Sequence, residues 1–95
     1  MLVEKIDLDK GSAMALGFRM QSAPLLVIRA DKGFLMCGYL DMETAEALGD
    51  VAVKVKGVST FDEMLRTQVV GATPKAIELG IKVGMTGKEA LEMMF

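Results

Sequence analysis

Alternating large and small side chains mark the clearest predicted strand of the chain. Between residues 12 and 20, large apolar side chains fall on every second position. They are Met14, Leu16, Phe18 and Met20, and Ala13, Ala15, Gly17 and Arg19 stand between them. A period of two is typical of a β-strand, and we expect methionines on its apolar face to pack in the core, with a ligand groove or subunit interface as the alternative. A shorter strand is predicted over residues 2–8.

Two nearly continuous apolar runs, residues 25–30 and 34–40, surround the charged turn Asp31-Lys32-Gly33. Such runs predict a hairpin whose strands are covered on both faces. The same tripeptide stands at residues 9–11. We therefore expect one turn chemistry to close both hairpins, with the glycine in a left-handed conformation that starts a bulge.

Helix signals are concentrated after residue 40. Capping residues predict four helix starts, at Asp41, at Thr60 with Glu63, at Thr73 with Pro74, and at Thr86 with Glu89. Short strands are predicted at residues 51–55 and 68–71. The chain is thus expected to be a single α+β domain over residues 1–95. Its sheet is mainly antiparallel, with a mixed sheet left open, and has about five or six strands built from two N-terminal hairpins, with three or four short helices.

The chain is unusually apolar for its size. Of its 95 residues 52% are hydrophobic, and the mean hydropathy is +0.37. A domain of this length buries roughly 60–68% of its unfolded surface, so its core has limited room. The few short helices are expected to cover one face of the sheet. We therefore expect a homodimer that buries part of the sheet or its helix edge.

Composition argues against several kinds of partner. The net charge is −2, and neither half of the chain is basic enough to bind a nucleic-acid backbone. The most apolar window, residues 24–40, is interrupted by charges and is too short to span a membrane. One cysteine allows no intrachain disulfide and no signal peptide is visible, so a cytoplasmic location is expected. Without histidine or a dense carboxylate cluster we expect no metal and no cofactor, whereas a small-molecule ligand stays open.

Cys37 is the strongest candidate nucleophile, and Tyr39 lies two residues after it. The chain has no histidine, so no Cys–His or Ser–His pair can form in it or in its homo-oligomer. The next predicted helix starts near Asp41, about 13 Å away along an extended strand, too far for its dipole to activate the thiol. A buried small side chain is therefore favoured over a reactive thiol. As alternate residues of one strand, Cys37 and Tyr39 are expected on the same face, where we look first for function.

Two charged segments resemble sites but are better explained as structure. Asp31 and Lys32 form an acid–base pair, yet the pair recurs in the other predicted turn, which indicates turn formation. The segment Thr86-Gly87-Lys88 starts a predicted helix, where backbone N–H groups can hold an anion. It lacks the spacing of a phosphate-binding loop, and a capping box uses some of its donors. The candidate catalytic residues are Cys37, Tyr39, Lys32 and Asp31, and the candidate ligand-binding residues are Thr86, Gly87 and Lys88.

Four blocks of the chain carry a family resemblance: residues 22–26, 30–40, 44–49 and 79–91. They resemble the YunC-like small proteins of archaea and bacteria, a domain of unknown function, and the block around Cys37 is the most specific. The resemblance covers nearly the whole chain. It implies a compact α+β domain, favours a dimer, and supplies no catalytic residues.

Three functions are compatible with these residues. A small cytoplasmic binding or regulatory module that forms homo-oligomers is favoured, because the sequence shows a scaffold without a catalytic constellation. The first alternative is a thiol-dependent enzyme that uses Cys37 with groups assembled across a subunit interface. The second is a structural subunit that binds a partner. An enzyme is thus the less favoured class, and no substrate is predicted.

Overall fold

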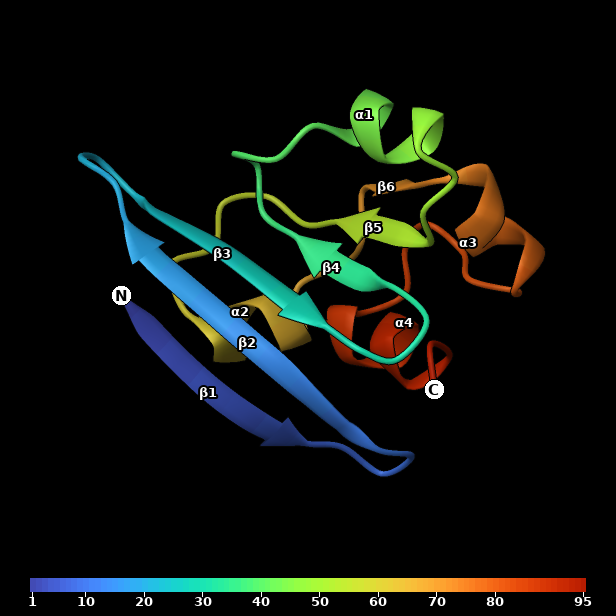
Figure 1. Ribbon diagram of the computed structural model, residues 1–95, viewed down its shortest axis with the longest axis horizontal. Helices are drawn as coiled ribbons and strands as arrows, with labels where there is room; N and C mark the ends of the chain where they lie inside the picture. The colour runs from blue at the N-terminus through green and yellow to red at the C-terminus, as the bar shows by residue number, and fades with distance from the viewer.

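A computed structural model describes all residues, 1–95, and places six strands in one sheet (Figure 1). The strands lie in chain order across the sheet. They are β1 (Leu2–Asp7), β2 (Ser12–Arg19), β3 (Pro24–Arg29), β4 (Phe34–Met36), β5 (Ala52–Lys54) and β6 (Gly71–Ala72). Four short helices follow β4, namely α1 (Met42–Ala47), α2 (Phe61–Arg66), α3 (Pro74–Glu78) and α4 (Gly87–Glu92).

The sheet is mixed but mostly antiparallel, which confirms the predicted α+β class. Strands β1 to β4 form an antiparallel meander, and β5 pairs with β6 in the same sense. Only β4 and β5 run parallel, and α1 lies in the connection between them. A parallel pair needs such a crossover because a tight turn can join only antiparallel strands.

Two of the predicted strands differ in extent from the observed ones. The strand expected over residues 34–40 ends at Met36, and the chain then turns. The strand expected at residues 68–71 is displaced to β6, and Gln68 instead forms an isolated bridge with Thr86. In both places a buried apolar residue lies outside the paired strands, Cys37 after β4 and Val69 before β6, so apolar character alone does not mark the strand boundary.

The two Asp-Lys-Gly turns close in the same way, as expected. Leu8 N–H donates to the Gly11 carbonyl and Ala30 N–H to the Gly33 carbonyl, each at 2.8 Å. The expected left-handed glycine is wrong, since neither glycine has a positive φ. Glycine is required at both positions because neighbouring atoms leave no room for a side chain. A Cβ on Gly11 would lie 2.5 Å from the Phe95 ring, and one on Gly33 would collide with the Val51 carbonyl.

The predicted helix caps are present. Asp41, Thr60, Thr73 and Thr86 each accept a backbone N–H from the first turn of their helix. Thr86 and Glu89 form the complete reciprocal box, whereas the Glu63 carboxylate accepts the N–H of Ser59 instead of that of Thr60. These caps satisfy donors that short helices would otherwise leave unpaired.

The two faces of the sheet are covered unequally. On one face the small side chains of β2 and the apolar side chains of β3 to β5 pack with α2 and α4 in the main core. On the other face α1 covers β4 and β5 in a small second cluster around Met36, Ala45 and Ala52. The β1–β2–β3 end projects away from α1 and α3 (Figure 1), and its outer face is open.

The open face corrects the expectation that methionines on predicted apolar faces lie in the core. Met36, Met64 and Met94 are fully buried, but Met14 and Met20 remain 50% and 44% exposed. The reason is that the core side of β2 carries alanine and glycine, so its larger side chains point outward.

Candidate functional site

Cys37 lies directly after β4 and is tied to β3. Its N–H donates to the Leu26 carbonyl at 3.2 Å, and its sulfur accepts the Leu26 N–H at 3.3 Å. The residue is only 3% exposed and belongs to the main core. The expected buried small side chain is therefore what the structure shows, with the addition that the sulfur serves as a backbone acceptor.

Tyr39 lies in the turn that follows, and this corrects the expectation that it shares a strand face with Cys37. Leu40 N–H donates to the Cys37 carbonyl at 3.3 Å, which folds the chain back after Met36. Because the strand has ended, the alternation of faces no longer applies. Tyr39 stands 49% exposed while Cys37 is buried.

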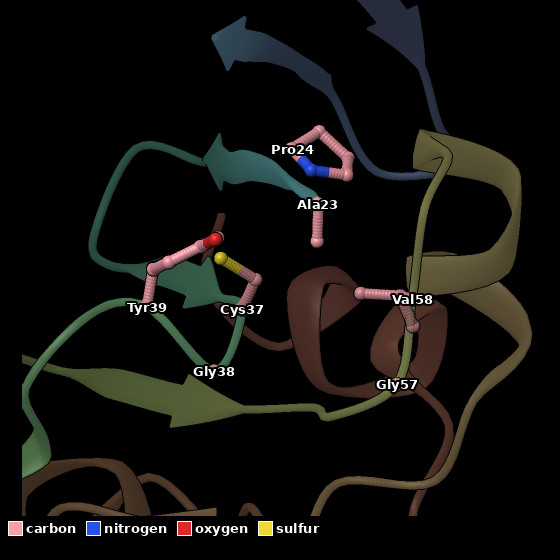
Figure 2. A pocket seen from close by; sticks show the side chains of 7 residues that line it. All are labelled: Ala23, Pro24, Cys37, Gly38, Tyr39, Gly57 and Val58. Atoms are coloured by element: carbon pink, nitrogen blue, oxygen red, sulfur yellow. The ribbon is translucent and has the colours of Figure 1, made fainter. Parts of the chain in front are cut away.

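The two residues nevertheless share a small hollow of about 230 Å³. Figure 2 shows the Cys37 thiol and the Tyr39 ring directed toward each other, with Ala23 and Pro24 on one side and Val58 on another. The remaining wall is backbone at Gly38 and Gly57. The hollow thus offers a thiol and a phenol on otherwise apolar or backbone walls.

A larger hollow of about 450 Å³ lies on the other side of Tyr39, against α1. Its apolar wall is formed by Phe34, Met36, Leu40, Ala45 and Leu48. Its polar groups come from Tyr39, Asp41, Thr44 and Asp50. Tyr39 therefore belongs to both hollows, and the lining residues of the larger one include two carboxylates and no lysine or arginine.

Asp41 is held in its ionised form at the rim of this larger hollow. The Thr44 hydroxyl, which donates to Asp41 at 2.5 Å, is the main cause that lowers the pKa of Asp41 below its usual 3.8. Desolvation is the second-largest effect and raises the pKa of Asp41, whereas the backbone N–H groups of Glu43 and Thr44 and the charge of Lys54 lower it further. The carboxylate is thus negative at neutral pH and still has lone pairs free for a donor.

Asp31 and Lys32 are not brought to this site. They lie in the exposed β3–β4 turn, at the opposite end of β4 from Cys37, about 16 Å away at the usual strand rise. The Lys32 N–H donates to the Met94 carbonyl at 2.7 Å, which ties the turn to the end of α4. Their position supports the interpretation as turn residues.

Thr86, Gly87 and Lys88 form a separate group at the start of α4. Gly87 is buried, its N–H donates to the Thr67 carbonyl at 2.9 Å, and a Cβ there would collide with the Met64 carbonyl. The N–H of Glu89 is used by the Thr86 hydroxyl. With these donors engaged inside the protein, capping and close packing explain the segment, and an anion site there stays a prediction.

Two further features bear on the classes of function. The structure contains no group of three or more cysteine and carboxylate side chains arranged to hold a metal ion. No helix combines the length and the apolar character needed to cross a bilayer.

Sequence reasoning missed two parts of the site. It predicted a helix start at Asp41 but assigned that helix no part in a site, whereas Thr44, Ala45 and Leu48 line the larger hollow. It also missed Asp50, which only the chain reversal after α1 brings to the hollow. The apolar positions of Ala45 and Leu48, three residues apart on a helix, were the available signal.

Comparison with known proteins places the chain in a family. The family model described as Domain of unknown function (DUF1805) matches residues 36–94, more than half of the chain. The chain belongs to this family. It is 37% identical to the Uncharacterized protein YunC of Bacillus subtilis (strain 168) over 84 residues, which cover 84% of this chain and 83% of that protein. A crystal structure of a protein of unknown function, TA1206 from Thermoplasma acidophilum, superposes with a TM-score of 0.94 at 36% identity, covering 99% of this chain and 92% of the other.

Proposed function

We propose that this DUF1805 protein is a cytoplasmic, homo-oligomeric binding module that takes a small ligand beside Tyr39. The observation that carries the proposal is the position of Tyr39, which lines both the hollow at Cys37 and the larger hollow at α1. An aromatic side chain that is half exposed between two concave surfaces is well placed to stack on a ligand. The free, unpaired Cys37 suits a reducing compartment.

The chemistry of the larger hollow indicates the ligand class. Phe34, Met36 and Leu48 supply an apolar wall, whereas Asp41 and Asp50 supply negative charge. A molecule with a flat apolar body and an amine would satisfy both parts, because the ring packs on the wall and the cation meets the carboxylates. The ligand proposed here is therefore an aromatic amine.

A single tryptophan at position 39 tests this proposal, because the chain has no tryptophan of its own. Fluorescence of Tyr39→Trp is recorded during titration with phenethylamine and, separately, with phenylacetate. We expect the amine to shift or quench the emission at far lower concentration than the acid. The matched control is Ile77→Trp, on α3 and 57% exposed, which should respond to neither compound. Equal responses at the two positions, or to the two compounds, would contradict the proposal.

A thiol-dependent reaction at Cys37 is the second candidate function. It is supported by the position of the Cys37 sulfur, which lines the smaller hollow beside Tyr39 and Val58. Reaction with Ellman's reagent tests it. A native rate close to that of the urea-unfolded chain would support the thiol as a nucleophile, and labelling only after unfolding would exclude it.

A further inference from the structure

The smaller hollow beside Cys37 is walled in part by backbone groups that have no partner in the protein. The N–H groups of Gly38, Gly57 and Val58 donate to no backbone carbonyl and to no side chain. Val58 is a buried residue, and buried N–H groups without an acceptor are rare in folded proteins. All three residues line the hollow of about 230 Å³, so a ligand in it can meet these donors.

Two side chains add further donors to the same wall. The Tyr39 hydroxyl makes no hydrogen bond within the protein, and Figure 2 shows it directed toward the Cys37 thiol. The Cys37 sulfur accepts the Leu26 N–H, which leaves its own S–H as a weak donor. No carboxylate is among the lining residues. The hollow therefore offers several hydrogen-bond donors and no negative charge.

The charge beside the hollow distinguishes an acid from an amide as its ligand. The carbonyls of Gly38 and Gly57 are also unpaired, so hydrogen bonding alone would allow a neutral amide. The stem of Lys56 passes Gly38, because its Cγ lies 4.0 Å from the place of a Cβ on that glycine. Lys56 is exposed and belongs to neither ion pair of the protein. A free ammonium group beside a wall of donors favours an anion.

We propose that the smaller hollow binds the carboxylate of a short aliphatic acid. Gly57 has a φ of 71°, and successive N–H groups around a left-handed residue can form a concavity that holds an anion. The alkyl chain of the acid packs on the apolar side chains of Ala23, Pro24 and Val58. At about 30 Å³ for each water molecule, the hollow has the volume of roughly seven waters, which suits an acid of about six non-hydrogen atoms.

This subsite goes beyond the aromatic amine proposed for the larger hollow. The two hollows differ in polarity, since Asp41 and Asp50 line the larger one, whereas backbone donors line the smaller one and Lys56 lies beside it. Tyr39→Trp removes the phenol and brings a bulkier ring to the wall of the smaller hollow, so the fluorescence titration reports on the larger one. The acid and the amine can therefore be tested separately.

An NMR titration of the full wild-type chain with sodium butyrate tests the subsite, with sodium chloride used to keep the ionic strength constant. The backbone amide resonances of Gly38, Gly57 and Val58 should shift and reach saturation. The dissociation constant is expected on the order of millimolar, because the ligand is so small. Butyramide has the same shape without the charge, and it should bind at least about tenfold more weakly.

Three variants and a matched control assign the groups that bind butyrate. Lys56→Gln should weaken binding at least about fivefold, whereas Lys56→Arg keeps the charge and should stay close to wild type. Tyr39→Phe removes one donor and should weaken binding about fivefold. Lys82→Gln changes an exposed lysine that lines neither hollow and should leave the affinity unchanged. Circular dichroism should show all variants folded.

The results that would overturn the subsite differ from those that concern the amine. Shifts that grow with butyrate without saturating, or equal affinity for butyramide, would overturn the carboxylate subsite. An affinity that both Lys56→Gln and Tyr39→Phe leave unchanged would overturn it as well. None of these results alters the tryptophan emission on which the amine in the larger hollow is judged. Saturable butyrate binding in a chain that fails the amine titration would support this subsite alone.

Discussion

Leu26 and Cys37 exchange two hydrogen bonds at the point where β4 ends, and one of them is accepted by sulfur. The N–H of Cys37 reaches the Leu26 carbonyl at 3.2 Å, and the N–H of Leu26 reaches the Cys37 sulfur at 3.3 Å. A backbone carbonyl would normally accept the second bond. The thiol thus continues the ladder between β3 and β4 by one step while the chain already turns toward Tyr39.

Replacing Cys37 by alanine removes that acceptor. The Leu26 N–H lies in the core with no other acceptor. We expect Cys37→Ala to lower the free energy of unfolding by about 1–3 kcal/mol, the usual cost of an unsatisfied buried donor. Urea unfolding followed by circular dichroism measures it. The exposed Ser22→Ala is the control, expected within about 0.5 kcal/mol of wild type. Equal stability of Cys37→Ala and wild type would show that the sulfur contact contributes nothing.

The two glycines of the repeated turn should differ in tolerance. Alanine at position 11 would press on the ring of Phe95, a side chain that can rotate aside, whereas alanine at position 33 would press on the fixed Val51 carbonyl. We expect Gly33→Ala to cost about 1–3 kcal/mol or more and Gly11→Ala clearly less. Thermal or urea unfolding compares them.

A double-mutant cycle identifies the contact that Gly11 makes. In a chain that carries Phe95→Ala, the further change Gly11→Ala should have almost no effect, because the ring it would meet is gone. If Gly11→Ala were equally costly with and without the Phe95 ring, the glycine would be required for the turn conformation itself. The close approach to Phe95 would then be incidental.

Local patterns predicted the elements of this fold well. The period of two from Ser12 to Met20 identified β2, and the capping residues placed the starts of all four helices. Strand alternation and helix capping each depend on a few neighbouring residues, so both can be recognised in a single sequence. The parallel pairing of β4 and β5 was only left open as a mixed sheet, although a helix was predicted between the two strands.

Long-range relationships were not predictable in the same way. Periodicity shows that Met14 and Ala15 face opposite sides of β2, but only the positions of α2 and α4 decide which side is the core. Gly11 and Phe95 are in contact although they are far apart in the sequence, and no local pattern predicts this contact. The apolar run continues past Met36, where β4 ends. The prediction that Cys37 and Tyr39 share one face of a strand was therefore wrong.

Thr73 should be the most important polar side chain for stability. It is fully buried, and its hydroxyl donates to the Asp50 carbonyl at 2.8 Å and accepts the N–H groups of Ala52 at 3.1 Å and Ala76 at 3.3 Å. It therefore joins the start of β5 to the start of α3. Thr73→Val keeps the shape but removes all three bonds, and we expect a loss of roughly 2–4 kcal/mol in the free energy of unfolding.

The matched comparison is Thr60→Val, which removes the cap of α2 at an exposed position. There water can replace the lost partner, so a loss of only about 1 kcal/mol is expected. Thr73→Ser should stay closer to wild type than Thr73→Val because the hydroxyl is retained. Equal losses at the two threonines would mean that burial adds nothing to the cap at Thr73.

The capping box of α4 should make stability depend on acid. The backbone N–H of Thr86, which donates to the Glu89 carboxylate at 2.9 Å, is the main cause that lowers the pKa of Glu89 below its usual 4.5, and the Thr86 side chain adds to it. A carboxylate whose pKa is lower in the folded than in the unfolded state stabilises the fold above its unfolded pKa. That contribution disappears as the pH falls through the folded pKa.

We expect Glu89→Gln to be less stable than wild type at neutral pH, and its stability should approach that of wild type below about pH 4. Urea unfolding across this range measures the difference, and Glu78→Gln, on exposed α3, is the matched control for the change from Glu to Gln. A gap between wild type and Glu89→Gln that stayed constant down to about pH 3 would show that the charge of Glu89 does not stabilise α4.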